Sequence, residues 1–157
     1  MEIWDSQTWQ KVGEIGGTSS ISQAESFDYY ALSGLAWSPD GTTIAVGLDN
    51  DVWLIHLADN QGNPLQVSTS ILSAAAANSS AGFASNMLTW APNSRYLAVS
   101  QNEAYGGLNI YDVSSQKNVL SGTNSYGEAF VALAWTADSK SITTADDGNI
   151  VYIWKII

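Results

Sequence analysis

Acidic side chains gather in the turn-forming stretches of this 157-residue chain. Asp and Asn are concentrated in residues 49–51 and again in 146–149, where a glycine joins them. Such loops can hold calcium, but the alternation of acids that ends in a glutamate is missing. Since Asp, Asn and Gly are also the usual residues of tight turns, we interpret both stretches as turns whose acids could contact a partner. The candidate residues are Asp49, Asp51, Asp146 and Asp147.

The sequence offers few residues for other kinds of catalytic chemistry. His56 is the only histidine and the chain contains no cysteine. A zinc site or a nucleophile–base pair needs further ligands or partners, so we interpret His56 as a packing residue. Two acids across a cleft could hydrolyse a glycosidic bond, but the spacing selects no pair. We therefore expect no catalytic residue, no metal and no cofactor.

The charge balance limits the partners. Fifteen acidic residues against five Lys and Arg give a net charge of −10. Phosphate backbones and anionic membranes attract clustered basic residues, so we expect neither nucleic acid nor a membrane as partner. No apolar run approaches the roughly 20 residues of a membrane span. The start of the chain lacks the basic and apolar regions of a signal peptide, and nothing indicates a compartment.

One sequence unit occurs three times and predicts the architecture. Residues 35–46 read as a strand ending in Trp37, a turn at Pro39-Asp40-Gly41, and a second strand. Proline and Asp favour the central positions of a type I turn, and Gly suits the left-handed position that follows. The same order recurs in residues 88–99 around Trp90 and in 133–144 around Trp135. Four strands per repeat of roughly 40–50 residues indicate the blades of a β-propeller.

The strand that follows each hairpin carries an isoleucine and then an aromatic residue or histidine. Together with the Trp-Ser-Pro-Asp-Gly hairpin, this pattern resembles the WD40 repeat family over nearly the whole chain. The resemblance implies four-stranded blades around a channel, and a scaffold role toward protein partners. The Gly-His pair common in the family is absent, so the hydrogen-bonded tetrad built on that His cannot form. The strand motifs are Ile3-Trp4-Asp5, Ile55-His56-Leu57, Ile110-Tyr111-Asp112 and Ile153-Trp154-Lys155.

We therefore predict one all-β domain over residues 1–157, with about three WD40-like blades of antiparallel strands. Residues 1–15 supply the last two strands of a blade, 31–70 and 86–121 supply two blades, and 130–157 supply three strands of another. Loops hold four tyrosines that could anchor a partner, since tyrosine offers a large ring and a polar tip; the resemblance implies that these connections share one face. The tyrosines are Tyr29, Tyr30, Tyr105 and Tyr126. The predicted strands are 1–8, 9–15, 32–37, 42–48, 52–57, 65–70, 87–90, 96–100, 108–113, 117–120, 131–135, 141–145 and 150–157.

Three blades are fewer than the four of the smallest propellers, so we expect another chain or further blades to complete the ring. Head-to-tail association would place residues 9–15 of one copy beside the open edge of 150–157 in the next. The alternative is that these residues are part of a longer propeller. The residues expected at the junction are Ile3, Trp4, Trp9, Val12, Ile153 and Trp154.

Three functions follow as hypotheses. The leading one is a non-catalytic scaffold that binds a protein or peptide through the loop face. The second is a structural half-propeller whose main property is ring closure by oligomerisation. The third is a hydrolase or lyase that uses acids at the mouth of the channel.

Overall fold

The computed structural model describes residues 2–14, 32–48, 51–58, 66–73, 87–101, 107–124 and 128–156. These ranges contain thirteen β-strands and no helix, which confirms the all-β class. Accordingly, they include no helix long and apolar enough to cross a membrane. The strands are β1 (Glu2–Trp4), β2 (Lys11–Glu14), β3 (Leu32–Trp37), β4 (Thr43–Leu48), β5 (Asp51–Ala58), β6 (Gln66–Ser73), β7 (Met87–Trp90), β8 (Tyr96–Gln101), β9 (Gly107–Asp112), β10 (Lys117–Thr123), β11 (Phe130–Trp135), β12 (Ser141–Asp146) and β13 (Val151–Lys155).

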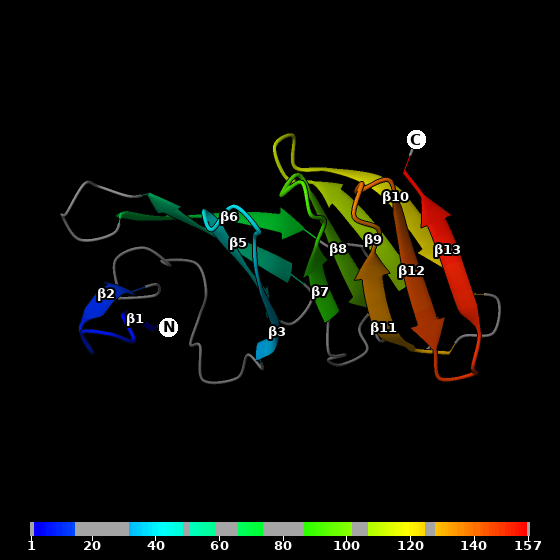
Figure 1. The fold of residues 1–157 in the computed structure, drawn as a ribbon, viewed down its shortest axis with the longest axis horizontal. Coiled ribbons are helices and arrows are strands. Elements are labelled where there is room, and N and C mark those ends of the chain that lie inside the picture. The colour runs from blue at the N-terminus through cyan, green and yellow to red at the C-terminus, as the bar shows by residue number, and fades with distance from the viewer. Residues whose placement is uncertain are drawn as a thin grey trace.

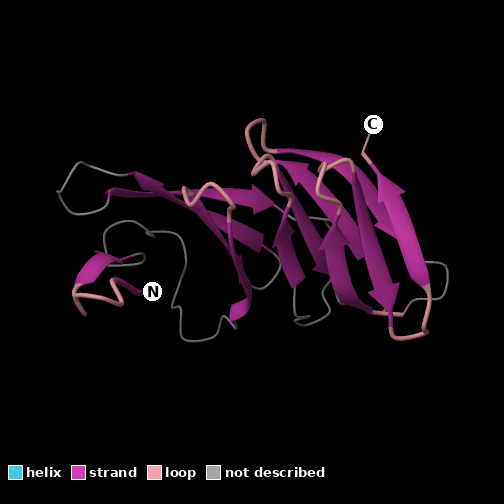
Figure 2. Cartoon of the chain, viewed as in Figure 1, coloured by secondary structure: helices cyan, strands magenta, loops and turns pink. Residues whose placement is uncertain are grey.

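The strands form one hairpin and three antiparallel sheets, each ordered as in the sequence. We call β1–β2 the N-terminal hairpin, β3–β6 sheet 1, β7–β10 sheet 2 and β11–β13 sheet 3. The three sheets follow one another side by side, with β13 at the far end (Figure 1). Coloured by secondary structure, the described chain is strand joined by turns and loops (Figure 2). Within the described residues, no strand pairing joins sheet 3 back to sheet 1 or to the hairpin.

The same turn joins the first two strands of every sheet. In sheet 1, Ser38 N–H donates to the Thr43 carbonyl at 2.8 Å, and Gly41 N–H donates to the Ser38 carbonyl at 2.9 Å. Gly41 has φ 75°, and the serines at the same position of the other two turns have φ 58° and 60°. The turn predicted from Pro39-Asp40-Gly41 therefore forms in all three repeats. The equivalents of Ser38, Gly41 and Thr43 are Ala91, Ser94 and Tyr96 in sheet 2, and Thr136, Ser139 and Ser141 in sheet 3.

The core lies between the sheets. Side chains alternate between the two faces of each strand. We call the face toward the next sheet in chain order the forward face, and the opposite one the rear face. The junction of sheets 1 and 2 buries Ala45, Val52, Leu54, Leu72, Trp90, Leu97, Val99 and Tyr111. The junction of sheets 2 and 3 buries Ala98, Leu108, Ile110, Phe130 and Ile142.

The N-terminal hairpin has the geometry of β9–β10, the last two strands of sheet 2. Both hairpins have a register shift at the same place, next to Ile3 and next to Ile110. Asp5 Oδ1 accepts hydrogen bonds from two turn N–H groups, and Asp112 Oδ1 does the same in its own turn. Trp9 has φ 56° where Gln116 has φ 55°. Trp9 thus lies in the turn and not in the strand predicted for residues 9–15, because the Asp5 side chain ends β1 and fixes the turn that follows.

The strand register corrects the predicted position of His56. His56 pairs with Thr43, the first residue of β4, so its counterparts are the residues that pair with Tyr96 and Ser141. Those counterparts are Asp112 and Lys155, whereas Tyr111 and Trp154 correspond to Ile55. The prediction aligned the Ile-aromatic pairs. It was wrong by one residue because Leu54 and Ile55 are both apolar, so the sequence does not show which of them faces forward.

Candidate functional site

Several predicted site residues lie outside the described part of the chain. These are Tyr29, Tyr30, Tyr105, Tyr126 and Asp49. Asp51 and Val12 lie on β5 and β2, but the structure describes only their backbone. The predicted loop face therefore remains a prediction.

The acidic turn between β12 and β13 contains one buried and one exposed carboxylate. Asp146 is buried, its Oδ1 accepts from Ile150 N–H at 2.8 Å, and its Oδ2 has no hydrogen-bond partner within the described ranges. The exposed Asp147 hydrogen-bonds the Glu128 side chain and, with its charge, raises the pKa of Glu128. Trp154 Nε1 donates to Thr144 Oγ1 at 2.9 Å nearby in the same sheet. Within the described residues, no group of three or more His, Cys, Asp or Glu side chains could hold a metal ion.

His56 takes part in a chain of hydrogen bonds across sheet 1. Its Nδ1 lies 3.2 Å from Thr43 Oγ1 on β4, and its Nε2 lies 3.0 Å from Ser70 Oγ on β6. Both ring nitrogens are thus engaged with side chains of the neighbouring strands. The half-buried ring joins three strands, which is a structural role.

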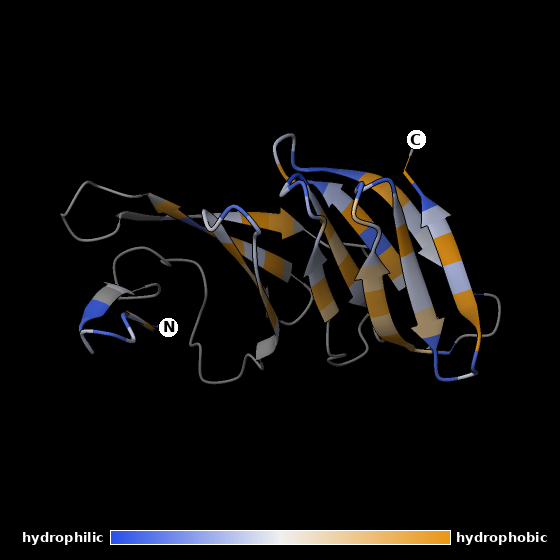
Figure 3. Cartoon of the chain, viewed as in Figure 1, coloured by the Kyte–Doolittle hydropathy of each residue, from blue (hydrophilic) through white to orange (hydrophobic). Residues whose placement is uncertain are grey.

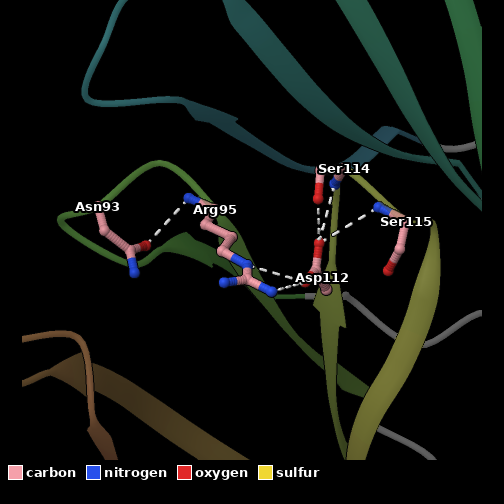
Figure 4. Close-up of polar contacts among 5 residues, drawn as sticks. All are labelled: Asn93, Arg95, Asp112, Ser114 and Ser115. Atoms are coloured by element: carbon pink, nitrogen blue, oxygen red, sulfur yellow. Dashed lines mark hydrogen bonds and ion pairs between the residues drawn. The ribbon is translucent and has the colours of Figure 1, made fainter.

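Asp112 is the centre of the best-defined polar cluster, shown in Figure 4. Its Oδ2 accepts from Arg95 Nε and Nη2 at 2.8 and 2.6 Å, and its Oδ1 accepts from Ser114 Oγ at 2.6 Å. The Ser114 hydroxyl, followed by the Arg95 guanidinium, lowers the pKa of Asp112 to about 2. Since every contact ties β9 to its own sheet, the cluster stabilises a turn. The cluster was not predicted from the sequence, although an Asp with serines two and three residues later is a signal for such a turn.

The forward face of sheet 3 is an open apolar face. By register, Val151 and Ile153 on β13 correspond to Leu108 and Ile110 on β9. Leu108 and Ile110 are both 0% exposed, whereas Val151 and Ile153 are 65% and 69% exposed. Figure 3 shows apolar segments alternating with polar ones along β13 at this end of the molecule. The difference arises because sheet 3 covers the forward face of sheet 2, and no described sheet covers that of sheet 3.

The rear face of sheet 1 is apolar and is open only along β3, since Ile44, Val46 and Ile55 on the same face are at most 7% exposed. Leu35 and Trp37 on β3 are 63% and 57% exposed. Their counterparts in sheet 2 are Leu88 and Trp90, and Trp90 is only 7% exposed. Trp90 packs against the forward face of sheet 1. Trp37 stands at the same place in its own sheet, but no described residue covers it in this way.

A repeated pair of hydrogen bonds ties the sheets together. Trp90 Nε1 donates to the Ala36 carbonyl of sheet 1, and Trp135 Nε1 donates to the Thr89 carbonyl of sheet 2, both at 3.1 Å. The turns are linked as well, because Asp40 N–H donates to Ser94 Oγ at 3.0 Å and Asn93 N–H donates to Ser139 Oγ at 3.1 Å. Neighbouring sheets are therefore aligned in the same way at both junctions. Trp37 Nε1 has no hydrogen-bond partner among the described residues.

The predicted junction residues divide between these faces. Ile153 lies on the open forward face of sheet 3, whereas Trp154 points to the opposite face and packs between sheets 2 and 3, over Gly122. Ile3 packs against the rear face of sheet 1, next to Ile44, Val46 and Ile55. Trp4 and Trp9 are exposed on the N-terminal hairpin.

Comparison with known proteins adds no family assignment, since no family model and no curated protein matches the sequence.

Proposed function

We propose that this chain is a non-catalytic scaffold of the partial β-propeller type, which binds a further β-sheet of protein through the forward face of sheet 3. Two observations support a propeller. The sequence repeats a WD40-like hairpin and third strand, and the three sheets pack on one another in the same way at both junctions. A module of this kind works by presenting surfaces to partners.

The observation that carries the proposal is the contrast between equivalent positions. Val151 and Ile153 have the register and apolar character of Leu108 and Ile110, which are completely buried under the next sheet. Fully burying an aliphatic side chain of this size contributes about 1.5–3 kcal/mol. Large apolar side chains at adjacent exposed positions therefore favour association with a partner.

The experiment uses the absence of cysteine from the chain. Two single-cysteine variants are compared, Ile153→Cys on the open face and Lys117→Cys at an exposed position of β10. We expect a maleimide to label Cys at 153 more slowly than Cys at 117 in concentrated protein, and equally fast after dilution. Equal labelling rates at every concentration would contradict the proposal that this face binds a sheet.

A further inference from the structure

We infer that the sheet bound by the forward face of sheet 3 is sheet 1 of a second copy of this chain, received through its rear face. Copies then associate head to tail, with Trp37 Nε1 of one copy donating to the Ala134 carbonyl of the other. The inference rests on the proposed function and names the partner of that site.

The two internal junctions are the template. At each of them, the tryptophan at the end of the first strand donates to the carbonyl that precedes the equivalent tryptophan one sheet earlier. Continuing this register beyond sheet 3 makes the Ala134 carbonyl the next acceptor. Trp37 is the one tryptophan of the three whose indole N–H lacks this bond in the described structure. The chain therefore contains both the donor and the acceptor of one further junction, Trp37 Nε1 and the Ala134 carbonyl.

The apolar surfaces match in the same register. At the first junction, Val52 and Leu54 of β5 pack against Leu97, Val99 and Tyr111 of the next sheet. Their counterparts at the new junction are Val151 and Ile153 on one side, and the cluster of Ile44, Val46 and Ile55 on the other. Both surfaces are aliphatic; Val151 and Ile153 are exposed, whereas Ile44, Val46 and Ile55 are buried in a cluster that includes Ile3 of the N-terminal hairpin.

The N-terminal hairpin competes for part of this surface. Ile3 packs on the Ile44 cluster, and the geometry of the hairpin makes it the counterpart of Ile110 in a preceding sheet. Ile153 of a second copy would occupy the same place. We expect the hairpin to move, because β13 is held by five register pairs with β12 and by the packing of Tyr152 and Trp154. On association, Val151 and Ile153 of the second copy then replace Ile3 in the contact with the Ile44 cluster.

The new junction is weaker than the two internal ones. Gly41 stands where Ser94 and Ser139 supply a hydroxyl to the preceding turn, so the turn-to-turn hydrogen bond cannot form. Thr143 stands where the other sheets have Ala45 and Ala98, and its hydroxyl already donates to the Ala134 carbonyl at 3.1 Å. We therefore expect association to depend on protein concentration. Because the two faces differ, head-to-tail contacts give a ring if the rotation closes and a filament if it does not.

The test mixes two variants, each of which destroys one face. Ile153→Lys places a charge on the forward face of sheet 3, and Trp37→Lys places one on the rear face of sheet 1. Both native side chains are exposed, so we expect both variants to fold. Each variant alone should remain a monomer of 16.8 kDa by light scattering. An equimolar mixture should form a dimer only, because each variant contributes its intact face. Val119→Lys, which changes an exposed apolar residue away from both faces, should associate like the unmodified chain.

Three outcomes would overturn the inference. The first is that a chain carrying both Trp37→Lys and Ile153→Cys is still labelled slowly by maleimide in concentrated solution. In that case the forward face binds a sheet other than sheet 1, and the proposed function survives without this inference. A mixture that stays monomeric, or an unmodified chain that is monomeric at millimolar concentration, would exclude the second copy as partner. Circular dichroism and thermal unfolding establish that both variants are folded before mixing.

A third variant tests the competition with the hairpin. Ile3→Asp removes the contact that occupies the rear face, so it should lower the concentration needed for half association roughly tenfold. Weaker association than in the unmodified chain would show that the hairpin belongs to the junction and would overturn this replacement of Ile3.

Discussion

Trp90 Nε1 donates a hydrogen bond of 3.1 Å to the carbonyl of Ala36, which lies 54 positions earlier in the chain and in the preceding sheet. The same bond recurs between Trp135 and Thr89. In sheets 2 and 3, the tryptophan at the end of the first strand thus fixes the position of the sheet relative to the preceding one. The tryptophan that marks the repeat in the sequence is also the residue that fixes its packing.

Replacing Trp90 with phenylalanine should therefore destabilise the chain. The change removes the bond to Ala36 and leaves a cavity at a buried site, which together cost about 1–3 kcal/mol. Trp37→Phe is the matched control, since Trp37 is exposed and lacks the bond, and should change the free energy of unfolding by less than about 0.5 kcal/mol. Urea unfolding of dilute protein measures both; equal losses would contradict this role of the indole.

Gly122→Ala should destabilise the packing of sheet 3 on sheet 2. A β-carbon at position 122 would clash with the six-membered ring of Trp154. Moving the ring costs about 1–3 kcal/mol, as is usual for overpacking. Thr123→Ala, on the exposed side of the same strand, is the control. Thermal unfolding should show a lower Tm for Gly122→Ala only, and an unchanged Tm would mean that the ring moves freely.

Asp112→Asn should destabilise the chain at neutral pH by about 1–2 kcal/mol, after allowance for the exposed Arg95 partner. The pKa of Asp112 is lowered to about 2, from an unfolded value near 4. A lowered pKa contributes stability above the unfolded pKa, and that stability is lost as the pH falls through the folded one. The free energies of unfolding of the two proteins should therefore converge between about pH 4 and pH 2. Parallel pH profiles would show that the charge of Asp112 is not what stabilises this turn.

The sequence was informative where local chemistry decides the structure. The turn at Pro39-Asp40-Gly41 and its two relatives form as predicted, because proline, Asp and a left-handed position act within four residues. All thirteen strands were expected, although β6 extends to Ser73, three residues beyond the prediction. Trp9 was misplaced because its turn depends on the side chain of Asp5, four residues away.

Contacts between strands and sheets were harder to predict. The register of β5 against β4 is set by the whole strand pair, so the position of His56 could not be read from the pattern around Ile55. The pairing of Arg95 with Asp112 joins two strands that the sequence separates by a turn. Ile153 and Trp154 were both assigned to a junction between chains, but adjacent residues of a strand face opposite ways, and Trp154 packs on sheet 2.

The most direct test of the account is the solution mass of the unmodified chain across a concentration series, measured by light scattering. The forward face of sheet 3 and the rear face of sheet 1 repeat the two sides of an internal junction and should bind each other once the hairpin moves. The mass should therefore rise from 16.8 kDa in dilute protein to at least twice that value when concentrated, and fall again on dilution. A mass of 16.8 kDa at every concentration would contradict the claim that these faces associate.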